Sequence, residues 1–193
     1  KVSEPTTMRH LRPISLCTVI YKTVSKVLVN RLKSIMPLCI SGNQAAFVRG
    51  RNITDNILIA HELIHTLNSD VTSLAKGASL KLDMEKAFDR VEWPFLEQVM
   101  LRLGFKSNWV SLIMRCISSV SYQVRINDSL SRPFKPSRGL RQGDPLSPFL
   151  FLFYTQGLSA LLNAEQATGH LPGLRASSCL LYTSDAADDM QCV

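Results

Sequence analysis

The spacing of apolar residues changes its period several times along this chain, and no other feature restricts the fold as strongly. In five segments apolar residues recur every three or four positions, as expected of amphipathic helices. In residues 78–84 and 122–126 they alternate with polar residues, as in strands, and Asn127–Ser129 predicts a hairpin turn. Helices and strands come in blocks rather than in strict alternation, which predicts an α+β fold. The expected helices are residues 20–36, 52–67, 93–103, 108–118 and 145–168.

The first two of these helices have separate apolar and polar faces. Pro37 is expected to end the first one, because proline lacks the amide hydrogen that a continuing helix needs. Its polar face is basic, with Lys22, Lys26, Arg31 and Lys33. The residues expected to be buried are Ile20, Val24, Val27, Leu28, Leu32, Ile35 and Met36 in the first helix, and Ile57, Leu58, Ala60, Leu63, Ile64 and Leu67 in the second.

Positive charge is concentrated at the front of the chain. Of a net charge of +7, residues 1–76 hold ten basic and four acidic side chains, whereas residues 77–193 hold twelve and eleven. A basic segment of this kind favours a polyanionic partner such as nucleic acid. Many soluble domains are mildly basic without such a partner, so charge alone leaves both interpretations open.

Cysteine spacing and hydropathy exclude several other classes of protein. The five cysteines have no short paired spacing, which argues against a disulfide framework and a zinc site and favours a reducing compartment. The most apolar run, residues 146–162, contains Ser147, Pro148 and Gln156. We therefore expect it to form a buried helix rather than a membrane span. The cysteines are Cys17, Cys39, Cys116, Cys179 and Cys192.

One candidate site begins at Asp83, near the end of the expected strand over residues 78–84. A carboxylate at the end of a strand is well placed to bind a hard cation such as Mg²⁺, which prefers oxygen ligands. Phe88 follows five residues later and could form one wall of a nucleotide pocket. An acid in this position is more often simply solvated, and that alternative stays open on these residues alone.

A second candidate site is the run RGLRQGDPLSP, residues 138–148. Its two glycines permit close approach of the backbone, and Arg138 and Arg141 could bind phosphate. Gln142 offers an amide to a base edge or a sugar, and Pro145 is a favourable residue for starting a helix. A glycine-rich basic loop before a helix is therefore a candidate phosphate site. The alternative is an ordinary surface loop whose glycines serve only the turn.

Together these segments resemble the reverse transcriptase domain of non-long-terminal-repeat retrotransposons, specifically plant LINE-type elements. The resemblance is carried by KLDMEKAFDRVEW (residues 81–93) and SRGLRQGDPLSPFLF (residues 137–151). Two earlier motifs are similar to the family's fingers motifs and occur in the same order. They are RPISLCTVIYKTVSKVLVNRLK (residues 12–33) and NQAAFVRGRNITDNILIAHEL (residues 43–63). The resemblance covers residue 5 to about residue 175.

The resemblance implies a right-hand polymerase fold without its thumb, with an antiparallel palm sheet packed on helices. Residues 1–76 would form a fingers-like helical segment and residues 77–177 the palm segment. It also implies RNA-directed DNA polymerase activity, which is nucleotidyl transfer with two Mg²⁺ ions. The implied partners are an RNA template, a DNA primer and a deoxynucleoside triphosphate, with no membrane, and the implied location is intracellular, in the nucleus.

The resemblance also implies roles for particular residues. Asp83 resembles the first metal-binding aspartate of the palm, and Phe88 resembles the aromatic gate beneath the sugar. Gly139 and Gln142 resemble the motif that contacts the incoming nucleotide and the template. Two arginines are candidates for triphosphate contacts in the fingers, namely Arg12 and Arg51.

The end of the chain departs from the family pattern. The family has an aromatic-Ala-Asp-Asp turn between two apolar strands, but here Ala186 takes the aromatic position. Residues 178–193 resemble translated sequencing-adapter read-through, and we expect the Asp188–Asp189 pair to be coincidental. The alternative, that Asp188 and Asp189 complete the catalytic carboxylates, stays open.

The chain begins at Lys1 rather than Met, so we expect it to be a fragment whose natural boundaries lie elsewhere. A fragment without a thumb or a second set of carboxylates is expected to be inactive by itself. The alternative is a non-catalytic nucleic-acid-binding remnant, or a conceptual translation that is never expressed.

Overall fold

This computed structural model describes residues 4, 6–7, 11, 14–68, 78–171, 174–177 and 180–182. The chain divides into two compact units, and each unit combines two separate stretches of sequence. Unit 1 comprises residues 1–30 and 86–151, and unit 2 comprises residues 31–85 and 152–193. The boundary expected after residue 76 falls in unit 2 and stays a prediction about polymerase subdomains.

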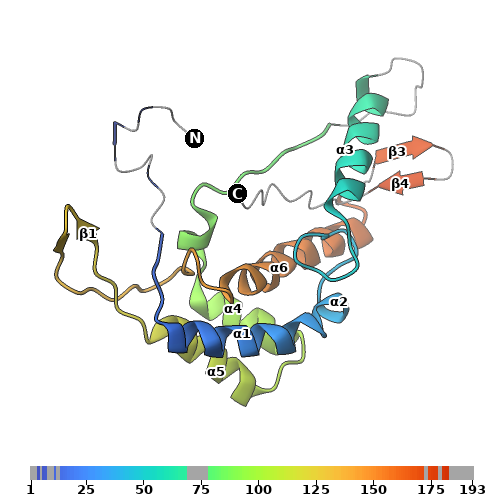
Figure 1. Cartoon of the computed structure of the whole chain (residues 1–193). Helices are drawn as coiled ribbons and strands as arrows, with labels where there is room; N and C mark the ends of the chain where they lie inside the picture. The colour runs from blue at the N-terminus through green and yellow to red at the C-terminus, as the bar shows by residue number, and fades with distance from the viewer. Residues whose placement is uncertain are drawn as a thin grey trace. The chain divides into compact units, whose positions relative to one another are not determined.

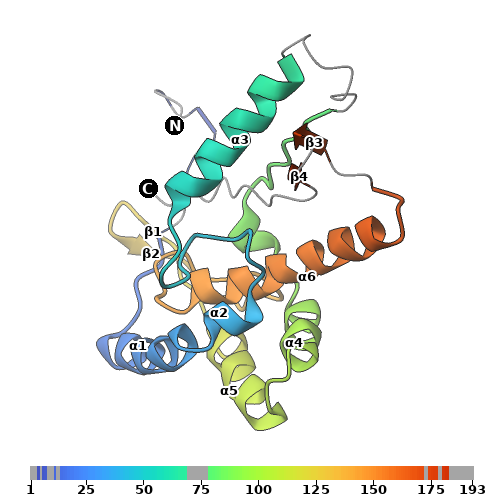
Figure 2. The same cartoon turned by 90° about the vertical axis from the view of Figure 1, so that its right-hand side faces the viewer.

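Helices make up most of the described structure, together with two antiparallel two-stranded sheets. Four of the five expected helices begin and end within two residues of their expected bounds, and the exception is the first one, which ends at Lys33 rather than at residue 36. Figures 1 and 2 show the elements from two sides. They are α1 (Val19–Lys33), α2 (Met36–Cys39), α3 (Ile53–Asn68), the 3-10 helix η2 (Ala87–Arg90), α4 (Trp93–Arg102), α5 (Ser107–Ser118), β1 (Arg125–Ile126), β2 (Ser129–Leu130), α6 (Ser147–Ala167), β3 (Leu174–Ser177) and β4 (Leu180–Tyr182).

In unit 1, α4 and α5 pack against each other through apolar residues at helical spacing. Pro94 lies in the first turn of α4, where its missing amide hydrogen costs nothing, and Gly104 follows the helix with φ +88°. The same core includes the residues that begin α6. The buried apolar residues of these three helices in unit 1 are Leu96, Met100, Val110, Ile113, Ile117, Phe149, Leu150 and Phe151.

The first half of α1 buries a different face from the expected one. Ile20 is 80% exposed, and Val24 and Val27 are also exposed. Ser25, a polar residue, is buried instead, because its hydroxyl donates a hydrogen bond to a buried carboxylate of unit 1. Leu28 and Leu32 of the expected stripe are buried, so the apolar periodicity was right for the second half of α1 and wrong for the first half, where polar pairing decides which side faces inward.

The end of α1 also differs from expectation. The helix ends at Lys33, and Pro37 does not stop it but lies in the first turn of the short helix α2. A proline disfavours helical geometry in the residue before it and is tolerated in a first turn. The break consequently comes before the proline, and a new helix forms around it.

The expected burial of the apolar face of α3 is wrong. No residue of α3 is buried, and Ile57 and Leu58 are 60% and 68% exposed. In the described part of unit 2, β3 is the element that lies against α3. A single short strand covers too little of the helix surface to bury a stripe that runs along it.

The strand expected over residues 78–84 is absent. These residues have no regular secondary structure, and all of them are exposed. A strand needs a neighbour to pair its backbone groups, and none of the described residues pairs with this segment. The expected palm sheet is therefore not present among the described residues.

The expected hairpin is confirmed. Strands β1 and β2 pair antiparallel, and Asn127 and Asp128 make the turn between them with positive φ angles. Tyr122 and Phe134 extend the pairing toward the base of the hairpin. A second hairpin, β3–β4, was not predicted from the sequence.

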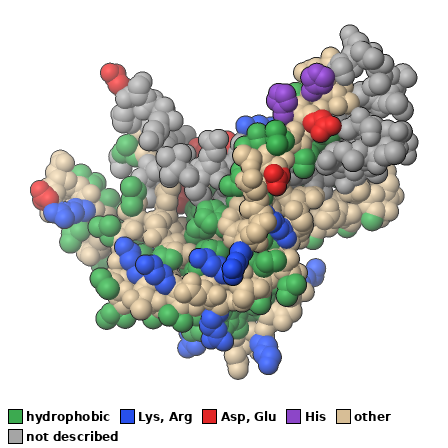
Figure 3. All heavy atoms as spheres, turned by 45° about the vertical axis from the view of Figure 1, so that its right-hand side comes forward, with side chains coloured by type: hydrophobic (Ala, Val, Ile, Leu, Met, Phe, Trp, Pro, Cys, Tyr) green, Lys and Arg blue, Asp and Glu red, His purple; other side chains and the backbone are tan. Residues whose placement is uncertain are grey.

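The surface mixes apolar and basic side chains. Figure 3 shows Lys and Arg side chains spread over the face in view, interspersed with hydrophobic ones. Lys22 and Lys26 of α1 are among the exposed basic residues. Among the described residues, no helix combines the length and the apolar character needed to span a membrane. The apolar run over residues 146–162 lies in and just before α6. Residues 149–153 are buried, as expected, but the second half of the run is not, and Leu158 and Leu161 are exposed.

Candidate functional site

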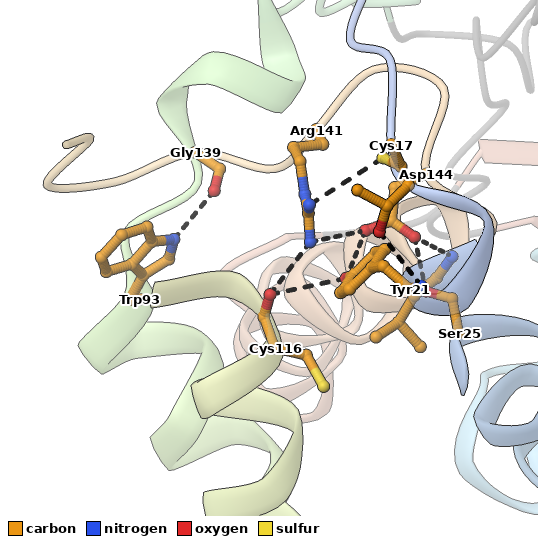
Figure 4. A network of polar contacts seen from close by, with 10 residues as sticks. Cys17, Tyr21, Ser25, Trp93, Cys116, Gly139, Arg141 and Asp144 are labelled. Carbon is orange, nitrogen blue, oxygen red and sulfur yellow. Dashed lines mark hydrogen bonds and ion pairs between the residues drawn. The ribbon is translucent and has the colours of Figure 1, made fainter. Parts of the chain in front are cut away.

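The two sequence motifs meet in unit 1 through backbone hydrogen bonds. The Gly139 amide donates to the Val91 carbonyl (2.8 Å), and the Leu140 amide donates to the Phe88 carbonyl (2.8 Å). The Trp93 indole Nε1 donates to the Gly139 carbonyl at 2.8 Å (Figure 4). Phe88 and Gly139, which the sequence assigned to one site, are therefore neighbours.

Close backbone approach explains the glycine at position 139. Its φ is +91°, which side chains rarely tolerate. A Cβ built on it would lie 3.1 Å from the Asp89 carbonyl oxygen and 3.3 Å from that of Phe88. Any larger residue would push the loop away from η2.

Phe88 is partly buried in η2, the short 3-10 helix that follows Lys86, which has a left-handed φ of 54°. Its ring stacks on that of Phe151, with centroids 5.1 Å apart and planes 17° apart. Aromatic stacking of this kind contributes roughly 0.5–1.5 kcal/mol beyond burial. One face of the Phe88 ring is therefore engaged in packing, which fixes where the ring can lie.

Gln142 and Gly143 are held to the segment that precedes α1. The Gln142 carbonyl accepts a hydrogen bond from the Ser15 amide at 3.0 Å. Gly143 has φ +101°, and a Cβ there would lie 3.1 Å from the Ser15 carbonyl oxygen. The side chain of Gln142 is half-buried. The loop backbone is thus fixed at two points, by η2 at Gly139 and by Ser15 at Gln142 and Gly143.

A buried carboxylate lies at the end of the loop. The side chain of Asp144 is 1% exposed and accepts hydrogen bonds from the Tyr21 hydroxyl (2.6 Å) and the Ser25 hydroxyl (2.7 Å), as Figure 4 shows. It also accepts one from the Leu146 amide at 3.0 Å, just before α6. Burial and the bond to Asp144 raise the pKa of Tyr21 above its ordinary value.

Arg141 completes this network. Its Nη2 lies 3.3 Å from the Asp144 carboxylate and donates to the Cys116 carbonyl at 3.0 Å. The guanidinium also lies over the Tyr21 ring, 3.9 Å from its centroid, and the side chain is only 10% exposed. Buried partners occupy the guanidinium in this structure, and the phosphate-binding role expected of Arg141 stays a prediction. Arg138, the other arginine of the motif, forms an exposed ion pair with Glu92 at 2.9 Å.

Arg51 lies in unit 2 and binds carbonyl groups of its own loop. Its guanidinium donates to the carbonyls of Ser41, Gln44 (2.6 Å) and Ile40 (3.0 Å). These contacts close the loop between α2 and α3. A triphosphate contact by Arg51 stays a prediction, and the structure adds a role in holding this loop.

The remaining expected residues belong to the other unit or lie outside the described residues. Asp83 is exposed and belongs to unit 2, whereas Phe88, Gly139 and Gln142 belong to unit 1. Among the described residues, no three His, Cys, Asp or Glu side chains form a group that could hold a metal ion. The catalytic and metal-binding role of Asp83 stays a prediction. Three expected site residues lie outside the described residues, namely Arg12, Asp188 and Asp189.

The sequence did not identify the network of Tyr21, Ser25 and Asp144. One local signal could have located part of it. Asp144 stands between a glycine and a proline just before a helix, where an aspartate commonly accepts backbone amide hydrogen bonds. Its partners in α1 could not be found in the same way, because they lie more than one hundred residues earlier, at separations of 123 and 119.

Comparison with known proteins assigns the family. The profile of the "Reverse transcriptase (RNA-dependent DNA polymerase)" family matches residues 2–192. The chain is 34% identical over 183 residues to the "Transposon TX1 uncharacterized 149 kDa protein" of Xenopus laevis, covering 95% of this chain and 14% of that protein. It is 27% identical to a "Retrovirus-related Pol polyprotein from type-1 retrotransposable element R2" of Nasonia vitripennis, covering 94% of this chain and 17% of that protein.

A third relative is the "Probable RNA-directed DNA polymerase from transposon X-element" of Drosophila melanogaster, 25% identical over 93% of this chain and 20% of that protein. The chain thus spans at most a fifth of the length of these three relatives. The sequence resemblance to a reverse transcriptase is confirmed, and the alternative of a non-catalytic remnant is not favoured. This chain belongs to the reverse transcriptase (RNA-dependent DNA polymerase) family.

Proposed function

We propose that this chain is the fingers-and-palm part of a plant LINE-type reverse transcriptase, and that its parent protein copies RNA into DNA. The junction of Phe88 with Gly139 carries this proposal, because two motifs separated in sequence are held together by backbone hydrogen bonds. An incoming deoxynucleoside triphosphate would be bound at this junction, with the Phe88 ring beneath the sugar and Gln142 toward the base.

The proposal includes Mg²⁺ as cofactor, with Asp83 as a ligand. Asp83 is exposed and offers carboxylate oxygens, the ligand type that a hard cation prefers. The described residues offer no cluster of three such ligands, so further carboxylates of the parent protein would have to complete the site. When bound, the ions would stabilise the charge that develops during phosphoryl transfer.

The role of this chain's own residues is to position the nucleotide. The Asp144 network fixes the start of α6 and the Gln142 loop, and Gly139 fixes the loop against η2. Such preorganisation favours transfer because the reacting groups need not be ordered at the moment of reaction. An RNA template, a DNA primer started at a chromosomal nick and a nuclear location are part of the same proposal.

Primer extension on an RNA template by the parent protein tests this proposal. Asp83→Asn should lower the extension rate by at least ~100-fold, since loss of a ligand weakens transition-state stabilisation at roughly 1.4 kcal/mol per tenfold. Asp55→Asn is the matched control, because Asp55 is an exposed aspartate in the first turn of α3. If both variants extend the primer at equal rates, the assignment of Asp83 is wrong.

A further inference from the structure

The hairpin formed by residues 122–135 projects from the rest of unit 1 (Figure 1). It leaves apolar and basic side chains exposed. Its acidic residue, Asp128, is paired with Arg125 at 2.5 Å. Arg132 and Lys135 are exposed, and neither forms an ion pair in the part of the chain that the structure describes. The exposed large apolar residues of the hairpin are Val124, Ile126, Leu130 and Phe134.

Backbone hydrogen bonds and ring packing within the hairpin hold its two strands together. The Tyr122 and Phe134 backbones exchange two hydrogen bonds of 2.8 and 2.9 Å, and their rings lie 5.8 Å apart. The Ser131 amide and hydroxyl both bind the backbone of Val124 at 2.9 Å. Binding to this surface would therefore cost little ordering of the backbone.

The chemistry of this surface is that of a platform for single-stranded nucleic acid. Phe134 is 50% exposed, so part of its ring is open to stacking, and Lys135 is its chain neighbour. Unpaired bases stack on aromatic rings, and nearby cations bind the phosphates. The hairpin has three basic residues and one acidic residue, and the whole chain has a net charge of +7. This excess of positive charge complements a polyanion.

We propose that the 122–135 hairpin binds single-stranded RNA, with Phe134 as a stacking surface and Arg132 and Lys135 as phosphate contacts. The inference rests on the proposed function in taking nucleic acid as the ligand. It adds a binding element distinct from the Phe88–Gly139 junction, on a part of the chain to which the motifs assign no role.

The test is a fluorescence anisotropy titration of a labelled oligo(U) RNA with the whole chain at two salt concentrations. The double variant Arg132→Glu, Lys135→Glu should bind the RNA at least ~10-fold more weakly at low salt. The slope of the logarithm of its binding constant against the logarithm of the salt concentration should be smaller in magnitude, by roughly 0.7 for each lost phosphate contact. Phe134→Leu keeps an apolar side chain but removes the ring. It should weaken binding by about fivefold or more with an unchanged slope.

The matched control is Arg102→Glu, Lys106→Glu, which makes the same charge change at exposed residues of unit 1 outside the hairpin. If the hairpin and control variants lose the same affinity, only bulk charge matters and the hairpin proposal is overturned. Unchanged binding by all variants would also overturn it and would leave the hairpin as a surface for a protein partner.

Failure of the proposed function gives a different result. In that case the unmodified chain binds neither oligo(U) nor an RNA–DNA hybrid at low salt. Only the hairpin proposal fails if two results come together: the unmodified chain binds the hybrid, and the hairpin variants bind oligo(U) as tightly as the unmodified chain does. Unchanged thermal unfolding of each variant establishes that the comparison is between folded proteins.

Discussion

At the scale of single residues, Asp144 is the side chain on which the loop geometry depends most. Replacing it with Asn leaves Arg141 buried without its opposite charge and weakens the acceptor for Tyr21 and Ser25. Removing one partner of a buried ion pair typically costs about 3–5 kcal/mol. We expect Asp144→Asn to lower the free energy of unfolding by about 3 kcal/mol in urea titrations.

The control for Asp144 is the same substitution at Asp128, whose side chain is 88% exposed in its ion pair with Arg125. An exposed pair contributes about 0–1 kcal/mol, so Asp128→Asn should change the free energy of unfolding very little. Equal losses at the two positions would contradict a structural role for the buried network.

Tyr21 should make the free energy of unfolding fall as the pH becomes alkaline. Its pKa is raised in the folded protein by burial and by the hydrogen bond to Asp144. The unfolded chain then loses the phenolic proton first, so stability from Tyr21 is complete below the ordinary pKa of about 10 and declines above it. The difference in unfolding free energy between the unmodified chain and Tyr21→Phe should therefore shrink between about pH 9 and about pH 11.

Lysines and the other tyrosines titrate in both proteins, so the comparison with Tyr21→Phe cancels their contribution. A difference that stays constant over this range would show that the Tyr21 proton has the same affinity in the folded and unfolded chains.

The sequence predicted some site residues and missed others for a physical reason. Phe88 and Gly139 each stand in a short continuous motif, and the family resemblance placed both motifs at one site. The buried state of Asp144 depends on Tyr21 and Ser25, which a helix more than one hundred residues away supplies. A carboxylate that looks like a loop residue becomes a core residue only when such donors reach it.

At the scale of elements, the contact between the Gly139 loop and η2 can be tested with two glycines of similar conformation. Gly139 and Gly104 have φ angles of +91° and +88°, but only Gly139 has atoms within 4 Å of a built Cβ. An alanine at either position carries the conformational penalty of about 1 kcal/mol or more, and Gly139→Ala must also displace η2.

We therefore expect Gly139→Ala to lower the free energy of unfolding by about 1–2 kcal/mol more than Gly104→Ala does. Urea unfolding of both variants measures the difference. Equal effects would mean that the loop is not pressed against Asp89 and Phe88.

Elements whose signals are local were predicted well, and those that depend on neighbours were not. The α4 helix has a proline in its first turn and a glycine after its end, and the β1–β2 turn has residues that favour positive φ. The strand over residues 78–84 required a pairing partner, and the buried face of α3 required a covering layer. A local pattern specifies what an element can do, whereas its neighbours decide whether it pairs or is buried.

At the scale of the whole molecule, the basic front of the chain should bind nucleic acid in a salt-sensitive way with little sequence preference. Residues 1–76 hold ten basic and four acidic side chains, and Lys22 and Lys26 are exposed on α1. Binding to an RNA–DNA hybrid should weaken as salt rises, because each phosphate contact releases counterions. Replacing Lys22 and Lys26 with Glu should reduce both the affinity for the hybrid and its dependence on salt in an anisotropy titration. If the affinity of the unmodified chain does not change with salt, the prediction is wrong.

The last prediction is that residues 1–193 alone do not extend a primer. Phosphoryl transfer with two metal ions needs carboxylates from at least two strands, and the described residues contain no cluster of three candidate ligands. Each 1.4 kcal/mol of lost transition-state stabilisation costs roughly tenfold in rate, so an incomplete ligand set costs several such factors.

A primer-extension assay with the purified chain, Mg²⁺ and an RNA template should therefore give no more product than the Asp83→Ala control. Extension well above that control would show that Asp188 and Asp189 do complete the site. The interpretation of residues 178–193 as read-through would then be wrong, because a coincidental pair of aspartates has no reason to lie where the reacting phosphate needs them.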